Sequence, residues 1–390
     1  MLTLLLVIIF ISFIGVGLPD SVLGAAWPVM YREMNLPISL AGYISMTVSV
    51  GTVISSFLSA KLINKFGTGL VTAVSTLLTA IALLGFSHTR NPAFFFLLTI
   101  PLGLGAGAVD TALNAFVALH YSASQMSYLH CFYGIGVAAS PFIMSFALGD
   151  SGNWRRGYLI VALIQFALTA LCFISLPLWN KIQKKDKEGE SAPVRTLTVG
   201  EMVRTKGVLL SCFAFFASCA VEITVGQWSA SFFVNTKGLE ADTAALVAML
   251  FYVGLASGRF LSGVLMSRFG RRGLLRISLV LLPIAIFVYM LPVHPVISAI
   301  ALLFIGLGVG PIYPNLMHLT PDFFGEDVAQ SIMGLQQALT YVGIMLMPWL
   351  FGVLANTFST ALLPAYLMAL CVIYCVILIA LLKIMEAEKK

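Results

Sequence analysis

Residues 263–272 read Gly-Val-Leu-Met-Ser-Arg-Phe-Gly-Arg-Arg, and residues 60–67 carry a related stretch, Ala-Lys-Leu-Ile-Asn-Lys-Phe-Gly. The shared element, a basic residue followed by Phe-Gly, begins at Lys65 and recurs 203 residues later at Arg268. In both places it separates two long apolar runs. A glycine there permits a tight turn, and the basic side chains can contact lipid phosphates. The pattern therefore predicts corresponding loops in two related halves of a membrane protein.

Other matches recur at nearly the same spacing. Gly-Leu-Gly-Ala-Gly at 103–107 corresponds to Gly-Leu-Gly-Val-Gly at 306–310, again 203 residues on. At offsets of 201 to 207 residues, three more sets correspond: Gly136 and Pro141 with Gly343 and Pro348, Asp20 with Glu222, and Trp27 with Trp228. Parallel repeats of six spans imply two bundles related by an axis along the membrane normal.

The composition restricts the class of protein. Of the 390 residues, 59% are hydrophobic and only 10% are Asp, Glu, Lys or Arg, whereas an ordinary soluble domain is about a quarter charged. A soluble chain of this length needs far more polar surface. The composition therefore excludes a soluble enzyme, a disordered protein and a nucleic-acid binder, and it indicates a helical integral membrane protein. The six cysteines lie inside apolar runs, so we expect them to be small core residues rather than metal ligands or disulfides.

The apolar runs predict the number of membrane crossings. The hydrocarbon core is about 30 Å thick, so a crossing helix needs about 20 apolar residues. We place spans at 2–33, 38–64, 68–87, 92–121, 125–149, 154–180, 204–236, 240–268, 272–291, 294–320, 327–355 and 359–384. This predicts an all-α integral membrane fold of twelve transmembrane helices in two pseudo-symmetric six-helix bundles. We expect residues 1–180 and 204–390 to form the bundles and residues 181–203 to form a cytoplasmic linker.

The distribution of Lys and Arg predicts the orientation, because cytoplasmic loops carry an excess of both. Most of these residues fall on one side of the predicted spans, so we expect both termini and the linker to be cytoplasmic. We expect the membrane to be the inner or plasma membrane of the cell. Thr198 and Glu201 fit a capping box, which predicts a short surface helix before the seventh span, the alternative being an unstructured solvated linker. We expect Arg259, within the eighth span, to snorkel toward the cytoplasmic surface.

Three carboxyl groups lie at membrane depth: Asp20 in the first span, Asp110 in the fourth and Glu222 in the seventh. An ionised group at a helix centre costs about 2.5–3.5 kcal/mol on insertion scales. No Lys or Arg lies deep in the amino-terminal half to pair with Asp20 or Asp110. We therefore interpret all three as cation-coupling groups that take up a proton near neutral pH or jointly hold Na⁺. Structural, hydrogen-bonded acids are the alternative.

Neutral polar and aromatic side chains accompany these carboxyls. Asn114 lies four residues after Asp110, on the same helical face, and His130 opens the fifth span. Amides, hydroxyls and aromatic faces are the groups that bind neutral polyols, although each can instead join two helices. We predict substrate contacts from the following residues: Asn114, His130, Gln337, Gln336, Gln227, Trp228, Asn315, Tyr313 and Trp27. For Trp27 a gate or interfacial role is the alternative.

The repeat and the loop pattern resemble the major facilitator superfamily over the whole chain. The signature loop of that family reads Gly-x-Leu-x-Asp-Arg-x-Gly-Arg-Lys, and its acidic position is occupied here by Asn64 and Ser267. These replacements put the charge-relay role of the signature in doubt. The matching residues, which we interpret as a cytoplasmic gate and loop motif, are Lys65, Gly67, Arg268, Gly270 and Arg271. The resemblance implies two bundles that rock around a central site.

Glycine and proline concentrate in the first, fourth and tenth spans. Such residues are tolerated in a membrane where the freed backbone faces a cavity, and they also permit close helix packing. In the resembled family these three spans and the seventh line the cavity, which favours a bending or cavity role over packing alone.

Three short segments narrow the resemblance to the fucose-permease and sodium/glucose transporter group. They are Gly-Leu-Pro-Asp-Ser at 17–21, Ala-Val-Asp-Thr-Ala-Leu-Asn at 108–114 and Tyr-Leu-His-Cys-Phe-Tyr-Gly-Ile-Gly-Val-Ala-Ala-Ser-Pro at 128–141. This resemblance implies monosaccharide uptake driven by H⁺ or Na⁺, with the first- and fourth-span carboxyls in coupling. The sequence Ser-Pro-Phe-Ile at 140–143 breaks the drug-antiporter pattern.

The prediction is a secondary active transporter that moves a small neutral polyhydroxylated solute, most simply a hexose, by H⁺- or Na⁺-coupled symport. We expect no enzymatic activity, no metal site and no cofactor apart from the coupling ion. The expected partners are the solute and the lipid bilayer, with no nucleic acid, and the chain is expected to be a monomer. One alternative is H⁺-driven export of an amphipathic or anionic metabolite or drug. Another is a non-transporting sensor, which is disfavoured because such proteins usually carry long cytoplasmic extensions.

Overall fold

The computed structural model describes residues 2–121, 123–186 and 197–387, and within them it is all helical. The elements of the amino-terminal half are α1 (Leu2–Glu33), α2 (Leu40–Phe66), α3 (Thr68–His88), α4 (Pro92–His120), α5 (Ala123–Ser151) and α6 (Trp154–Asp186). The remaining elements are α7 (Val199–Arg204), α8 (Val208–Asn235), α9 (Ala241–Met290), α10 (Pro295–Val309), α11 (Ile312–Phe324), α12 (Glu326–Thr357), η1 (Thr360–Leu362) and α13 (Leu363–Ala387).

The expected twelve crossings are confirmed once α9 is understood as two of them. Eleven helical segments in the described part of the chain are long and apolar enough to cross a membrane. One is α9, whose 50 residues extend about 75 Å at 1.5 Å per residue, far more than one bilayer core. The helix is interrupted at Gly270, where φ is 63° and ψ is 170°. Gly67, its counterpart in the first half, has φ of 81° and ψ of 154°. Both motif glycines therefore form the predicted tight turns.

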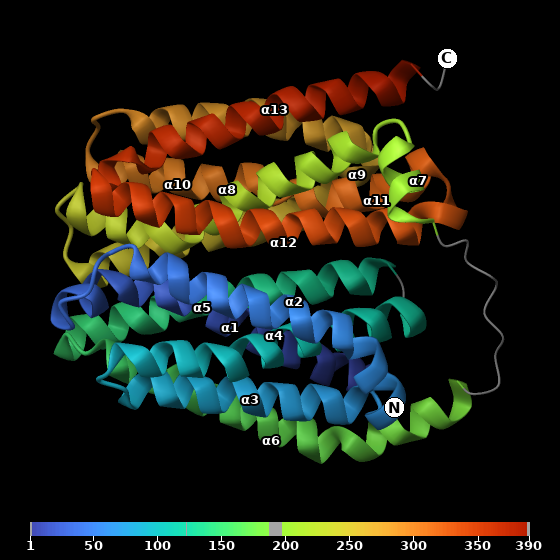
Figure 1. Ribbon diagram of the computed structural model, residues 1–390, viewed down its shortest axis with the longest axis horizontal. Coiled ribbons are helices and arrows are strands. Elements are labelled where there is room, and N and C mark those ends of the chain that lie inside the picture. Colours follow the sequence, from blue (N-terminus) through green and yellow to red (C-terminus); the bar gives the residue numbers. More distant parts are fainter. Residues whose placement is uncertain (1, 122, 187–196, 388–390) are drawn as a thin grey trace.

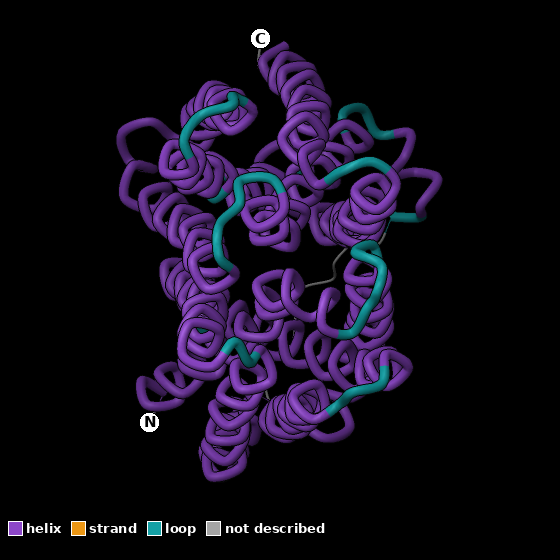
Figure 2. The backbone as a smooth tube through the Cα atoms, turned by 90° about the vertical axis from the view of Figure 1, so that its left-hand side faces the viewer, coloured by secondary structure: helices purple, strands orange, loops and turns teal. Residues whose placement is uncertain are grey.

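The two halves lie side by side as two groups of roughly parallel helices (Figure 1). Helices α1 to α6 form one group and α8 to α13 form the other, with the beginning of α1, the end of α13 and the short α7 all at the right-hand end of the view. Viewed from the opposite end, the helices are seen nearly end-on and short loops join neighbours (Figure 2). We call the end that holds the termini the termini end and the opposite end the outer end.

The two groups contact each other from the outer end down to mid-membrane. At the outer end the Tyr31 hydroxyl of α1 donates a hydrogen bond of 3.0 Å to Asn235 of α8. A Cβ at Gly24 of α1 would lie 2.7 Å from the carbonyl oxygen of Gly226 in α8. Tyr43 of α2 meets Trp349 of α12 edge-on, with ring centroids 5.8 Å apart. These contacts close the outer side of the boundary between the bundles.

The repeated glycines allow close contact between helices within each half. The expectation that glycines bend the first and fourth spans is corrected accordingly. A Cβ at Gly107 of α4 would lie 2.2 Å from the Thr52 carbonyl oxygen of α2, and a Cβ at Gly310 would lie 2.5 Å from that of Leu255 in α9. Both α1 and α4 remain single helices despite their internal prolines. The tenth span breaks between α10 and α11, after Val309, where Gly310 and Pro311 lie. The glycines thus serve close packing, and among the first, fourth and tenth spans only the tenth is interrupted.

The predicted capping box is present. The Thr198 amide donates to Glu201 Oε2 at 2.8 Å, and the Glu201 amide donates to Thr198 Oγ1 at 3.4 Å, so α7 begins as expected. Residues 187–196 of the predicted linker lie outside the described residues, and α6 continues to Asp186, beyond the predicted end of the sixth span. All six cysteines are free and are buried or half-buried, as expected.

Candidate functional site

The two amino-terminal carboxyls have neutral hydrogen-bond partners. Asp20 of α1 accepts a hydrogen bond of 2.7 Å from the Tyr133 hydroxyl of α5. Asp110 of α4 accepts one of 2.9 Å from the Asn114 amide, one helical turn later, so the predicted pairing on one face is confirmed. Asn114 also donates to the Asp110 carbonyl oxygen at 3.0 Å. Neither carboxylate has a cationic partner among the ion pairs of the described residues.

Asp20 faces the space between the helices rather than the lipid. It is exposed, whereas its neighbours Pro19 and Ser21 are buried. It interacts electrostatically with Asp110 of α4 and with Glu222 of α8. Because these helices surround α1 on its inner side, the exposed surface of Asp20 faces the boundary between the bundles, where water can reach it.

Glu222 differs from the other two carboxyls because it has a cation. Its Oε1 lies 3.0 Å from Arg259 Nη2, and the two side chains are only 11% and 13% exposed. The expectation that Arg259 snorkels to the cytoplasmic surface is therefore wrong: the guanidinium turns inward from α9 to the carboxylate on α8. A carboxylate at this depth lowers the desolvation cost of the arginine, whereas snorkelling would have left Glu222 unpaired.

Tyr133 connects the two halves of the site. The Arg259 guanidinium carbon lies 5.8 Å from the centroid of the Tyr133 ring, within the range of a cation–π contact. The hydroxyl of the same tyrosine binds Asp20. A continuous series of contacts therefore runs from Asp20 through Tyr133 and Arg259 to Glu222, across the boundary between the bundles.

Two more predicted groups, His130 and the pair of Tyr313 with Gln337, belong to this central region. His130, half-buried on α5, meets the Phe13 ring edge-on at 5.8 Å and interacts electrostatically with Arg259. The Tyr313 hydroxyl of α11 donates to Gln337 Oε1 of α12 at 2.8 Å. Tyr313 and Asp110 also interact electrostatically, although they belong to different bundles. The region thus combines carboxyl, amide, imidazole and phenol groups from both halves.

Four predicted contact residues lie away from any accessible surface. Trp27 donates to the Ile38 carbonyl oxygen at 2.8 Å and Trp228 to that of Pro348 at 2.9 Å, and both rings are fully buried. Gln336 joins Thr320 and Ser211 through both ends of its amide. Asn315 donates to Ser262 at 2.8 Å. These contacts correct the assignment of the four side chains to a substrate surface, because in this conformation they join helices.

Gln227 is the exception among the buried candidates. It is 8% exposed, and its Nε2 is a buried donor that lacks a hydrogen-bond partner among the described residues. Its backbone packs against Gly24 of the other bundle. A buried donor without a partner costs free energy. Gln227 therefore remains a candidate substrate contact, although in this conformation the contact with Gly24 covers it.

Sequence reasoning missed the roles of Tyr133 and Arg259. Tyr133 lies three residues after His130, so a helical-face argument could have placed both side chains together. Arg259 lies 37 residues after Glu222, and no local spacing relates the two. Only the packing of α8 against α9 brings that acid and that base together.

The loop motif of the second half has an acidic partner from another helix. Arg271 forms an ion pair with Asp322 near the end of α11, whereas the acidic position of the signature holds Ser267. Arg268 stacks on the Phe269 ring, and Lys65 lies 5.1 Å from the centroid of the Phe66 ring. An ion pair therefore joins α9 to α11 beside the loop motif of the second half.

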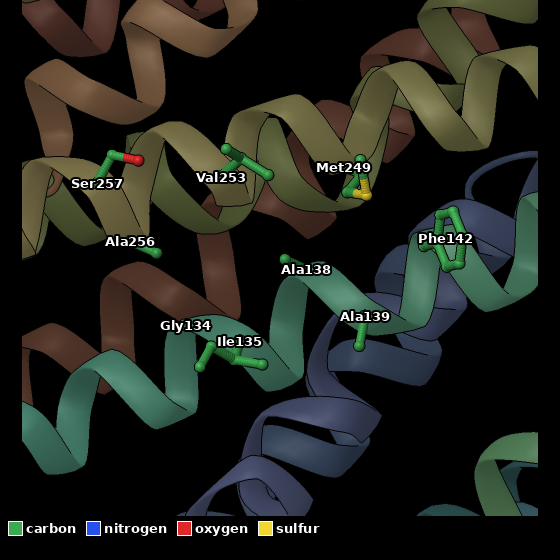
Figure 3. Close-up of a pocket in the computed structure, with 9 residues that line it drawn as sticks. All are labelled: Gly134, Ile135, Ala138, Ala139, Phe142, Met249, Val253, Ala256 and Ser257. Carbon is green, nitrogen blue, oxygen red and sulfur yellow. The ribbon is translucent and has the colours of Figure 1, made fainter.

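An open apolar groove of about 350 Å³ lies between α5 and α9 (Figure 3). Its lining is made of Gly134, Ile135, Ala138, Ala139, Phe142, Met249, Val253, Ala256 and Ser257. Small side chains predominate, and they let the two helices approach closely: a Cβ at Gly134 would lie 2.8 Å from the Ala256 Cβ.

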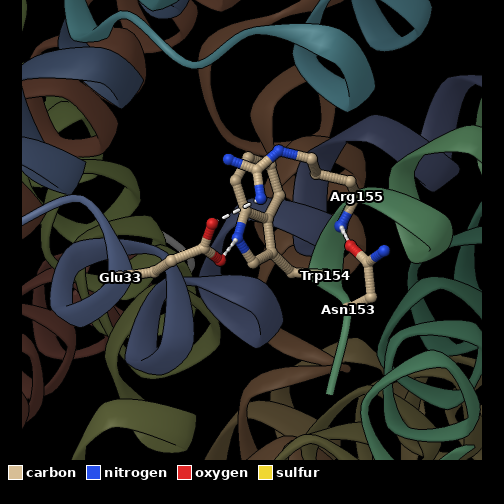
Figure 4. A network of polar contacts seen from close by, with 4 residues as sticks. All are labelled: Glu33, Asn153, Trp154 and Arg155. Atoms are coloured by element: carbon tan, nitrogen blue, oxygen red, sulfur yellow. Dashed lines mark hydrogen bonds and ion pairs between the residues drawn. The ribbon is translucent and has the colours of Figure 1, made fainter. Parts of the chain in front are cut away.

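A polar network joins α1 to α6 at the outer end of the first bundle (Figure 4). Glu33 accepts 2.6 Å and 2.5 Å hydrogen bonds from Trp154 Nε1 and Arg155 Nη1. The Arg155 guanidinium carbon lies 4.2 Å from the centroid of the Trp154 ring. Asn153 Oδ1 accepts from the Arg155 amide at 3.0 Å. This network holds the outer end of α1 within its own bundle.

The described residues contain no group of three or more His, Cys, Asp or Glu side chains placed to hold a metal ion.

The family model described as Major Facilitator Superfamily matches residues 5–348 and 234–390. The chain is 22% identical to "Bypass of stop codon protein 6" of Saccharomyces cerevisiae over 388 residues, covering 91% of this chain and 77% of that protein. It is 24% identical to a hexuronate transporter of Bacillus subtilis, covering 69% and 67%. It is 22% identical to the glucose/mannose transporter GlcP of Bacillus subtilis, covering 79% and 77%.

Solved structures show the same fold. The crystal structure of a point mutant of the nucleoside transporter NupG superposes with a TM-score of 0.78 at 14% identity, covering 96% of this chain and 98% of that one. The inward open xylose transporter XylE from E. coli superposes with a TM-score of 0.75 at 15% identity, covering 96% and 95%.

Proposed function

The chain belongs to the major facilitator superfamily, and on that premise we propose that it is a symporter of a small neutral polyhydroxylated solute, a hexose being the first candidate. Transport is driven by H⁺ or Na⁺, and the two bundles rock around the central site to expose it to each side in turn. The observation that carries this proposal is the pair Asp20 and Asp110, which face the boundary between the bundles with only neutral hydrogen-bond partners.

Coupling is assigned to these two carboxyls, with Asp110 first and Asp20 as its partner. A carboxylate removed from bulk water is costly without a cation. Binding H⁺ or Na⁺ lowers that cost, and it does so most when solute completes the enclosure of the site. Glu222 has Arg259 as a permanent counter-ion, so its part in coupling is indirect.

A neutral solute fits the charge of the site better than an anion does. Arg259 is the cation at this depth, and Glu222 already neutralises it. The remaining polar groups are the Asn114 amide, the His130 ring and the hydrogen-bonded pair of Tyr313 and Gln337. Such groups donate and accept hydrogen bonds with hydroxyls. The glucose/mannose transporter of Bacillus subtilis among the relatives supports the same solute class.

Uptake into proteoliposomes tests the proposal. Radiolabelled D-glucose, D-mannose, L-fucose and D-xylose are offered with an imposed pH gradient, a Na⁺ gradient or neither. Accumulation of at least one sugar that requires one of the two gradients is the expected result. Uptake that is indifferent to both gradients, or no uptake of any neutral sugar, contradicts the proposal.

Export of an amphipathic or anionic metabolite or drug by H⁺ antiport is the second candidate. The hexuronate transporter among the relatives favours it, as does the depth of Arg259, which could bind a carboxylate if Glu222 were protonated. Thermal stabilisation separates the two candidates. Stabilisation by neutral sugars favours the first, whereas stabilisation by D-glucuronate or other organic acids with none by sugars favours the second.

We further propose a monomer in the inner or plasma membrane, with both termini cytoplasmic and bundle boundaries near residues 180 and 204. Cytoplasmic termini agree with the excess of basic residues at the end where α1 begins and α13 ends.

A further inference from the structure

Four side chains form an unbroken series across the boundary between the bundles. In the first bundle, Asp20 of α1 accepts a hydrogen bond from Tyr133 of α5 at 2.7 Å. The Tyr133 ring in turn lies under the Arg259 guanidinium of α9, 5.8 Å from ring centroid to Cζ. Arg259 pairs with Glu222 of α8 at 3.0 Å. Only the contact between Tyr133 and Arg259 crosses from one bundle to the other.

We propose that Tyr133 and Arg259 are positioning residues that transmit the charge of Asp20 to the second bundle, so that ionised Asp20 holds α5 against α9 and neutralised Asp20 releases them. The inference rests on the proposed function, because it assigns to the coupling carboxyl the conformational change that coupling requires. It adds that Tyr133 responds to the charge of Asp20, and that loss of this charge separates α5 from α9.

The strength of each contact depends on the charge of Asp20. A phenol donates a stronger hydrogen bond to a carboxylate than to a neutral carboxyl group. A cation above the ring is attracted to the ring face and also to the carboxylate beyond it. When Asp20 binds a proton or Na⁺, both attractions weaken, while the ion pair between Arg259 and Glu222 persists. Arg259 then belongs to the second bundle alone.

Several charged and titratable groups surround the two ends of this series. The groups that face Asp20 are Tyr133 of α5, Asp110 of α4, Glu222 of α8, Tyr252 of α9 and Tyr341 of α12. Those that face Arg259 are Glu222 and Cys219 of α8, Tyr133, His130 and Cys131 of α5, and Tyr313 of α11. Arg259 is thus the cation in this set. Tyr133 and Glu222 both face Asp20 and Arg259, and of the two Tyr133 donates a hydrogen bond to the Asp20 carboxylate whereas Glu222 repels it.

The helices that carry the bridging contact also pack closely beside it. A Cβ at Gly134 of α5 would lie 2.8 Å from the Ala256 Cβ of α9. An open apolar groove between the same helices has Gly134 and Ser257 at one end and Phe142 and Met249 at the other (Figure 3). The contact between Tyr133 and Arg259 therefore lies beside a close contact between the two bundles.

Distances between spin labels in nanodiscs, measured without any solute, test this inference. Asn64→Cys places a label near the end of α2, and Ser267→Cys places one at the corresponding position of α9, just before its interruption at Gly270. Both positions are exposed, whereas the native cysteines are buried or half-buried. The distance is measured as pH is raised from mildly acidic to mildly alkaline, with and without Na⁺. In the parent we expect one transition with pH or Na⁺.

Three variants and a control complete the experiment. Tyr133→Phe keeps the ring and removes the donor, and we expect the midpoint to move to higher pH by about one to two units, a ten- to hundredfold change in proton affinity, or Na⁺ affinity to rise comparably. Tyr133→Leu and the neutral double variant Glu222→Gln with Arg259→Gln should lose most of the transition. Arg276→Gln breaks an exposed pair with Glu386 far from the site and should behave like the parent.

The outcomes are separable. A parent without any response to pH or Na⁺, a parental midpoint in Tyr133→Phe, or a parental response in the double variant each overturns the inference. If the parent and the variants behave as expected but no sugar accumulates in proteoliposomes, the proposed function fails and the inference stands for another solute. If accumulation is coupled but Tyr133→Phe keeps the parental midpoint, the inference alone fails.

Discussion

The two bundles carry corresponding carboxyls in different surroundings. Asp20 and Glu222 lie 202 residues apart, at matching positions of the first and seventh spans. Glu222 pairs with Arg259, whereas Asp20 receives only the hydroxyl of Tyr133. The residue 203 positions before Arg259 is Ser56, which instead bonds to the Gly107 carbonyl oxygen at 3.3 Å. The comparison teaches that corresponding carboxyls of related halves can differ in their surroundings: Glu222 has a cation within 3.0 Å, and Asp20 has a neutral phenol.

The largest effect is expected from Asp110→Asn, which removes a coupling carboxyl but keeps the shape and a partner for Asn114. Because the neutral amide mimics the protonated acid, gradient-driven accumulation should fall to background. Exchange of labelled for unlabelled sugar should continue, since it needs no net movement of the cation. Accumulation and counterflow in the same proteoliposomes measure the two activities. Accumulation that still follows the gradient in Asp110→Asn would show that Asp110 is not the coupling carboxyl.

Breaking the ion pair of the second bundle should have the next largest effect. Arg259→Gln leaves Glu222 buried without a cation, and removing one partner of a buried pair costs about 3–5 kcal/mol. The double variant with Glu222→Gln removes both charges and should recover much of that loss. Thermal unfolding in detergent, followed by loss of monodisperse protein, checks both. Equal melting temperatures for the parent and Arg259→Gln would mean that the pair contributes no stability.

The close glycine contacts should behave alike in the two halves. Gly107→Ala and Gly310→Ala each push a methyl group into a carbonyl oxygen of the neighbouring helix, and overpacking of this kind costs about 1–3 kcal/mol. Gly263→Ala, where a Cβ would meet no atom within 4 Å, is the matched control. The same unfolding measurement applies. If only one of the two variants is destabilised, the halves differ in packing as well as in charge.

The smallest effect is expected at the outer network of the first bundle. Glu33→Gln weakens the pair with Arg155, but both side chains are partly exposed, at 43% and 23%. Exposed pairs contribute about 0.2–1 kcal/mol and are screened by salt. The variant should therefore melt slightly earlier at low salt and together with the parent at high salt. A larger loss that persists at high salt would indicate that the Trp154 hydrogen bond, rather than the ion pair, holds α1 to α6.

Much of the fold follows from one-dimensional patterns. The bilayer requires about 20 apolar residues per crossing, so the spans and the turns at Gly67 and Gly270 could be predicted from residue order. The pairing of Asp110 with Asn114 was also predictable, because a helix places residues four apart on one face. The role of the glycines of α4 was harder to predict, because both bending and close packing favour glycine. Only the contact of Gly107 with Thr52 shows that close packing applies here.

The sequence by itself determined that this protein is a membrane protein of twelve spans in two related halves, with a few carboxyls at membrane depth. It did so because lipid forces every backbone group into helices of set length, and a repeat is visible in residue order. Tertiary structure alone decided which carboxyl has a cation. The 37 residues between Glu222 and Arg259 and the 113 between Asp20 and Tyr133 have no helical periodicity to relate them. Those partners are set by how helices pack, which depends on all side chains at the contact.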